Sequence, residues 1–301
     1  MSTLEAIPAA AGAAGASQPG GRAGRDAWRL LRRSPAGLAG LILVGLIVLL
    51  CLASASGLLH DPLIQTAADR MRPPSAEHWF GTDRFGRDVF ARVAAGVANS
   101  ARIALVAVAF SMLAGTVGGV VSGYLRGASD AAISGVTNVL FAFPPLLLAL
   151  TLASVFARTW FTIAVAIAIV YTPIFIRVTR GPVLTLREID FVRAARATGQ
   201  SAAAIMARHI LPNIASIVIV QVTLSLSWAV LTEASLSFLG LGAPPPAPSL
   251  GSMVYEARTL VALAPWTMVF PGLVMVVMVV GLNLLGDGVR DALDPQSRGK
   301  R

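Results

Sequence analysis

The sequence has few charges and a single cysteine. Only 13% of its 301 residues are Asp, Glu, Lys or Arg, whereas 55% are hydrophobic. This balance excludes an ordinary soluble domain. Cys51 has no partner in the chain, so a disulfide framework and a cysteine-based metal site are both excluded.

The chain also lacks the usual motifs of nucleotide binding and hydrolysis. It contains no P-loop, no Gly-x-Ser-x-Gly and no His-Glu-x-x-His motif. Its three histidines are His60, His78 and His209. Asp83 and Asp88 lack the spacing of a calcium loop, and we interpret them as part of a turn before a surface helix over 88–98. We therefore expect no catalytic residues, no metal site and no cofactor bound by this chain.

Six apolar runs are long enough to cross a bilayer, which takes about 20 helical residues. None alternates with the period of a strand, so we predict an all-α integral membrane protein with six spans. The small-residue end of the first run is similar to a signal-peptidase site, but five further runs favour its retention. The expected spans are 38–56, 103–123, 133–156, 161–178, 214–233 and 268–285.

Basic residues predict the orientation. Six spans place both termini and the connecting segments 124–130 and 177–212 on the same side of the membrane. That side carries 16 of the 24 Lys and Arg residues, and the other side carries 8. The positive-inside rule makes the first side cytoplasmic. The expected organisation is a disordered, basic N-terminal tail (1–35), a first helix with an extracytoplasmic segment (36–98), a transmembrane domain (99–288) and a cytoplasmic C-terminal tail (289–301).

Between the fourth and fifth spans, residues 187–196 carry five charges. At roughly 2.5–3.5 kcal/mol per charge, this segment would cost over about 12 kcal/mol at mid-bilayer, so it lies outside the lipid. Thr185 and Glu188 fit a capping box that starts a helix near Leu186, and Gly199 suits the position that ends it. Ser201 is expected to cap a second short helix that Pro212 ends. The first helix would place Phe191, Ala194, Ala195 and Thr198 on one face.

This segment resembles the EAA loop of ABC importer permeases, whose coupling helix docks in a groove of an ATPase subunit. The resemblance rests on two alanines, a glycine four residues later and a Leu-Pro pair twelve residues after that glycine. Arg193 stands where the family has the glutamate that names the loop. The positions that the resemblance assigns to ATPase coupling are Phe191, Val192, Arg193, Ala194, Ala195, Arg196, Gly199, Leu211 and Pro212.

Segments 80–96, 142–150 and 231–253 are similar to signatures of the C-type permease subunit of dipeptide, oligopeptide and nickel importers. The resemblance implies a type I ABC importer (MetI-like) core in a bacterial inner membrane. It also implies a second permease subunit as heterodimer partner, two ATPase subunits or domains that hold ATP and Mg²⁺, and an extracytoplasmic binding protein. Di- and oligopeptides are the expected substrates. Nickel or another small solute is the alternative, while an ion-driven transporter or a membrane enzyme fits less well.

Two features inside the spans bear on a translocation path. The third span contains a proline-containing break with Phe141, Phe143 and Pro144. This break either shapes the translocation path or serves only in packing between helices. Glu233, at the outer end of the fifth span, is either functional or an interfacial acid that pairs with a loop arginine or bonds to backbone. A stripe of Gly115, Gly119 and Gly123 indicates close helix packing.

Overall fold

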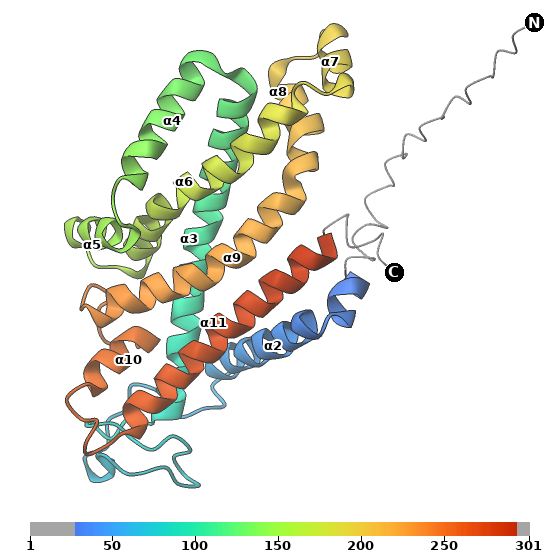
Figure 1. Ribbon diagram of the computed structural model, residues 1–301. Helices are drawn as coiled ribbons and strands as arrows, with labels where there is room; N and C mark the ends of the chain where they lie inside the picture. The colour runs from blue at the N-terminus through green and yellow to red at the C-terminus, as the bar shows by residue number, and fades with distance from the viewer. Residues whose placement is uncertain (1–27, 294–301) are drawn as a thin grey trace, which may run out of the picture.

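The computed structural model describes residues 28–293, and all of its regular elements in that range are helical (Figure 1). A short helical stretch at 28–33 precedes the first long helix. The transmembrane-length and connecting helices are α2 (Pro35–Ala55), η1 (Ala67–Asp69), α3 (Val89–Leu125), α4 (Gly127–Phe141), α5 (Pro145–Val155), α6 (Trp160–Leu186), α7 (Asp190–Ala197), α8 (Ala202–Ile205), a π-helical turn (Met206–Ile210), α9 (Leu211–Phe238), α10 (Leu250–Ala257) and α11 (Trp266–Leu293).

Five helical runs within the described residues are long and apolar enough to span a membrane. A sixth candidate is the pair α4 and α5, which passes the same test together but is bent by 94°. Pro144 precedes α5 and Pro145 is its first residue, and a proline cannot donate the backbone hydrogen bond that would continue α4. The predicted break is confirmed, and the expected span over 133–156 corresponds to two separate helices, α4 and α5.

Two other expected boundaries also differ from the structure. The surface helix expected at 88–98 is the first part of α3, which continues without interruption to Leu125. Asp88 caps this helix, since its carboxylate accepts a hydrogen bond of 2.7 Å from the backbone N–H of Ala91. The fourth span extends beyond 178 to Leu186. Most of the N-terminal tail expected at 1–35, and the end of the C-terminal tail, lie outside the described residues.

The core of the bundle is the packing of α3 against α6. A Cβ atom on Gly115 would lie 2.4 Å from Cβ of Phe175, and one on Gly123 would lie 2.9 Å from the carbonyl oxygen of Arg180. The glycine stripe therefore lets the two backbones approach more closely than side chains would allow, as in other membrane helix pairs. This confirms the structural interpretation of the stripe.

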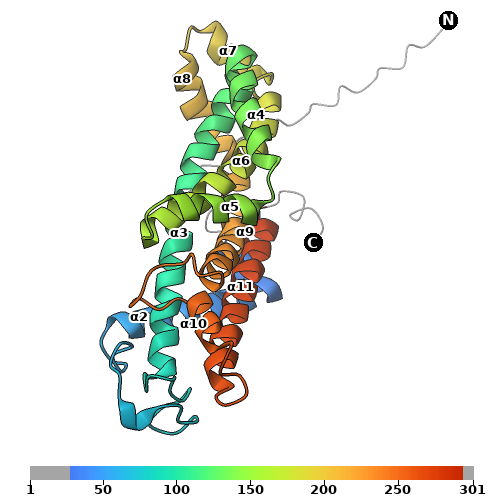
Figure 2. The same cartoon turned by 90° about the vertical axis from the view of Figure 1, so that its left-hand side faces the viewer.

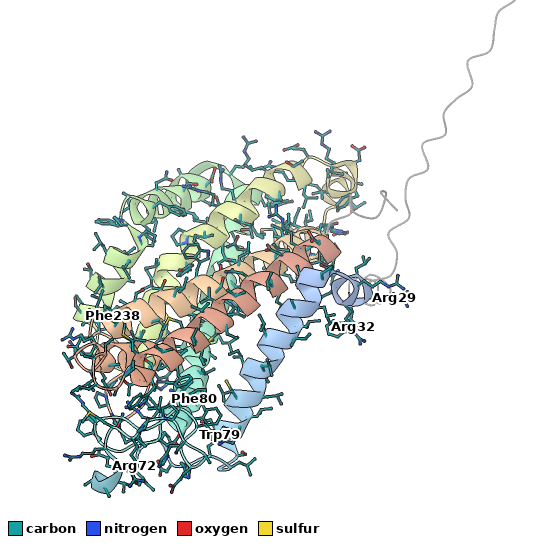
Figure 3. The ribbon with its side chains drawn as sticks, turned by 60° about the horizontal axis from the view of Figure 1, so that its bottom comes forward. Arg29, Arg32, Arg72, Trp79, Phe80 and Phe238 are labelled. Carbon is teal, nitrogen blue, oxygen red and sulfur yellow. The ribbon has the colours of Figure 1, made fainter. Side chains whose placement is uncertain are left out.

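Helix α2 lies along α11 at the edge of the bundle (Figure 1). Small residues again permit the approach, because a Cβ atom on Gly40 would lie 2.3 Å from the backbone nitrogen of Leu285. In Figure 3, Arg29 and Arg32 lie beside one end of α2, whereas Trp79 and Phe80 lie near its other end. The segment 56–88 therefore covers the end of the bundle that is far from α7 and α8 (Figures 1 and 2).

Candidate functional site

A charged elbow, defined as residues 187–210, connects α6 to α9. It comprises α7, α8 and the π-helical turn, and it projects at one end of the bundle (Figure 2). Its inner side belongs to a second hydrophobic cluster, separate from the main core, that includes Tyr124, Val183 and Ile214. The elbow is therefore packed on the ends of α3, α6 and α9.

Helix α7 attaches to this cluster by two residues. Val192 is fully buried and Ala195 is 6% exposed, whereas Phe191 is 42% exposed. Arg193, Ala194 and the other α7 residues are exposed. The expected apolar face is thus divided: Ala195 faces the bundle, while Phe191 and Ala194 remain available to a partner.

Gly199 ends α7 as the sequence predicts. Its φ angle is +80°, a left-handed conformation that side chains with a Cβ atom disfavour. Its N–H donates to the carbonyl oxygen of Arg196 at 3.0 Å, and the N–H of Gln200 donates to that of Ala195 at 3.2 Å. This is the Schellman arrangement, which satisfies the last carbonyls of the helix and turns the chain sharply.

Of three other local predictions for the elbow, one is confirmed and two were wrong. The capping box was wrong: Thr185 lies inside α6, and Ile189, the residue before α7, makes no capping bond through its side chain. The cap by Ser201 is confirmed by a hydrogen bond of 3.3 Å from the N–H of Ala204 to the Ser201 hydroxyl. Pro212 does not end this unit, because the helical run continues from Ala202 to Phe238. As the second residue of α9, Pro212 follows the π-helical turn.

Two arginines of the elbow contact α3, and one glutamate pairs with an arginine within the elbow itself. Arg187 donates a hydrogen bond of 2.8 Å to the carbonyl oxygen of Tyr124. The guanidinium of Arg196 lies over the Tyr124 ring, 5.6 Å from its centroid. Arg193 donates to Glu188 at 3.4 Å, and this contact lowers the pKa of the Glu188 carboxyl, with smaller contributions from the nearby arginine charges. Glu188 is thus ionised at neutral pH.

A second candidate site is a groove of about 530 Å³ between α4, α5, α6 and α9. Phe141 and Phe143 line it, as does Pro145, whereas Pro144 and Glu233 do not. Among the described residues, those that line this groove are uncharged. The role of Phe141, Phe143, Pro144 and Glu233 in translocation stays a prediction.

Sequence reasoning missed a stripe on α9 that faces this groove. Its members recur every three or four residues, which is one face of an α-helix. The hydroxyls of Tyr171 and Thr232 lie 3.0 Å apart across the groove wall, and Gln221 donates to Ser225 at 3.0 Å. The period was visible in the sequence, although nothing there shows which face is open. The stripe consists of Gln221, Ser225, Trp228, Thr232 and Ser235.

Glu233 has a different environment from the groove residues. It is fully buried and accepts hydrogen bonds of 2.7 Å from the hydroxyls of Ser100 and Ser237. It therefore connects α3 to α9 inside the chain. The expectation of an interfacial acid with an arginine or backbone partner was wrong, because Glu233 is buried and its partners are serine hydroxyls.

Residues 115–299 match the family described as "binding-protein-dependent transport system inner membrane component", and this range includes the last part of α3 and all that follows in the described chain. The chain belongs to this family. Residues 23–74 match the N-terminal transmembrane domain of oligopeptide transport permease C. The expected family is confirmed, and the protein is a multi-pass permease component of ABC importers.

Curated relatives are similar over nearly the whole length. The chain is 39% identical to the dipeptide transport system permease protein DppC of Alkalihalophilus pseudofirmus, over 91% of this chain and 90% of the relative. It is 37% identical to the glutathione transport system permease protein GsiD of Pectobacterium atrosepticum, over 90% and 91%. It is 38% identical to the probable D,D-dipeptide transport system permease protein DdpC of Escherichia coli, over 90% and 91%.

Solved structures support the fold of the core. An inward-facing structure of the MetNI methionine ABC transporter is similar with a TM-score of 0.56, at 19% identity, over 67% of this chain and 96% of that chain. At this identity the similarity shows the fold alone. It confirms the MetI-like architecture that the resemblance implied for the permease.

Proposed function

We propose that this permease carries di- or oligopeptides inward, without chemistry of its own, while ATPase partners hydrolyse ATP. Similarity to permeases named for dipeptides, D,D-dipeptides and glutathione supports small peptides as the substrate class. The groove supports it as well, because its neutral amide and hydroxyl groups suit the hydrogen-bonding backbone of a peptide.

The pathway would form between this groove and the corresponding surface of a second, similar permease. An extracytoplasmic binding protein would deliver the peptide at the end of the bundle that segment 56–88 covers. The two ATPases would hold ATP and Mg²⁺ and bind the elbow of each permease chain. The excess of basic residues at the elbow end supports a cytoplasmic position for both termini and for the elbow.

One observation carries this proposal. Helix α7 is fixed to the bundle by Val192 and Ala195, yet it presents Phe191 and Arg193 outward. An exposed aromatic residue on a firmly supported helix is the usual form of an anchor that enters a pocket of a partner. Arg193 adds a positive charge where the family has a negative one, so the ATPase groove of this transporter is expected to complement a cation.

The test is to replace Arg193 with glutamate in the complete transporter and to measure how much ATPase co-purifies with the permease. Reversing the charge should weaken assembly and uptake of a labelled dipeptide, since like charges at an interface repel. Arg208→Glu is the matched control, because it makes the same charge change at an exposed position of the π-helical turn. If the Arg193→Glu transporter assembles and transports like the wild type, or if Arg208→Glu weakens assembly to the same extent, the proposed contact at Arg193 is refuted.

A further inference from the structure

Three side chains with metal-binding chemistry meet at the end of the bundle opposite the elbow. His60 follows α2, His78 lies in the connecting segment, and Asp88 directly precedes α3. One potential ligand atom from each lies within 4.8 Å of the other two. Nδ1 of His78 is 2.7 Å from Oδ2 of Asp88, and Nδ1 of His60 is 3.6 Å from the same oxygen.

The Asp88 carboxylate is arranged to serve both helix capping and this cluster. Its Oδ1 accepts the hydrogen bond from the Ala91 N–H that caps α3, so its Oδ2 is the atom that faces the histidines. Asp88 is 6% exposed and His78 is 9% exposed. A simple hydrogen-bonded His–Asp pair needs only one imidazole, yet two of the three histidines of the chain lie at this one oxygen.

We propose that His60, His78 and Asp88 bind a divalent transition-metal ion of the zinc type. Two imidazole nitrogens and one carboxylate oxygen form a common three-ligand set for Zn²⁺, with water in the fourth position. Metal–ligand bonds of about 2.0–2.1 Å in a tetrahedron separate the ligand atoms by roughly 3.3 Å. The His60–Asp88 distance of 3.6 Å is close to this value, and the His78–Asp88 distance of 2.7 Å reaches it by a small rotation of the His78 ring.

The ligand types select the class of ion. Imidazole favours zinc, cobalt, nickel and copper, whereas Ca²⁺ and Mg²⁺ prefer sites made entirely of oxygen ligands. Bound metal would join the chain just beyond α2 to the first turn of α3 and would thereby fix the segment 61–87 between them. The site lies outside the candidate spans and does not depend on the proposed peptide substrate or on the ATPase contact.

The experiment is a titration of the purified full-length chain in detergent, prepared through a tag without histidine. Cobalt(II) is the spectroscopic probe, because its visible absorption reports tetrahedral coordination, and zinc(II) is then added in competition. We expect one ion per chain with micromolar or tighter binding, displaced by zinc. His60→Ala should weaken binding at least about tenfold, since even changes beyond the direct ligands of a metal often weaken binding by 10–100-fold.

His60→Ala is the decisive variant, because the side chain of His60 is 61% exposed and its loss should leave the fold intact. A far-ultraviolet circular dichroism spectrum checks the helical content. His209→Ala is the matched control, since His209 belongs to the elbow and should not affect binding. Binding weaker than micromolar, binding unchanged in His60→Ala, or an equal loss in His209→Ala would each overturn the proposal.

Discussion

Replacing Gly199 with valine tests whether the turn after α7 transmits the action of the ATPase. Gly199 has a φ of +80°, and a Cβ atom built on it would meet no atom within 4 Å. The Cβ atom itself therefore meets no neighbour, and the expected effect of the substitution comes from the backbone conformation. A left-handed residue with a Cβ atom costs about 1–2 kcal/mol, which lowers the population of the native turn by roughly 5–30-fold.

The structure offers a matched control at the other end of α9. Gly240 has a φ of +82° and equally open space around its Cβ position. It also ends a helix in the same way, since its N–H donates to the carbonyl oxygen of Ser237 at 3.1 Å and that of Leu241 donates to Leu236 at 2.8 Å. Gly240→Val should therefore cost the same conformational energy without altering the elbow.

The assay compares three quantities in the reconstituted transporter: the amount of permease inserted, ATP hydrolysis and peptide uptake. Gly199→Val should insert normally and lose peptide uptake per ATP hydrolysed, whereas Gly240→Val should keep that ratio. Gly199→Asn should be intermediate, because asparagine tolerates the left-handed conformation better than valine. Full uptake by Gly199→Val, or an equal loss of the uptake ratio in both valine variants, would refute the reasoning.

Two further predictions concern stability, measured as thermal unfolding in detergent. Glu233→Ala should destabilise the protein by about 1–3 kcal/mol for each buried hydroxyl that it leaves unpaired. Ser100→Ala removes only one of these two hydrogen bonds and should have a smaller effect. Equal unfolding temperatures for the wild type and Glu233→Ala would contradict this prediction. Gly119→Ala should destabilise the protein by about 1–3 kcal/mol, because its Cβ would overlap Oγ1 of Thr179. Gly118→Ala should destabilise it less, because its Cβ would lie 3.3 Å from a movable side-chain carbon of Ile176. The opposite order of the two effects would contradict the close packing of α3 and α6.

Hydropathy and backbone chemistry predicted much of this fold because they act locally. A run of about 20 apolar residues must form a helix in a bilayer, so most spans could be found without the structure. The break near Pro144 and the turn at Gly199 follow from the restricted backbone of proline and the free backbone of glycine. These predictions needed no knowledge of distant residues.

The errors arose where distant residues decide the outcome. Thr185 and Glu188 have the pattern of a capping box, yet α6 continues through Thr185 because Val183, two residues earlier, is fully buried in the cluster beneath the elbow. Glu233 resembled an interfacial acid, but the hydroxyl of Ser100 on another helix lies beside it in the core. His60, His78 and Asp88 meet through a segment with no repeating pattern, so their proximity had no signal in the sequence.

The elbow and the groove share a single helical run, and this determines how movement of one affects the other. Residues Ala202–Phe238 form 37 helical residues, which extend about 55 Å at 1.5 Å per residue. The run carries the end of the elbow at one end and the groove stripe from Gln221 to Ser235 further along. Its irregular part is the π-helical turn at Met206–Ile210, which interrupts the regular hydrogen-bond pattern of the α-helix. A displacement of α7 is therefore either absorbed at this turn or transmitted along α9 to Trp228 in the groove. Because Ile205 and Ile210, at the two ends of this irregular part, are buried in the cluster beneath the elbow, the packing restrains the turn and favours transmission.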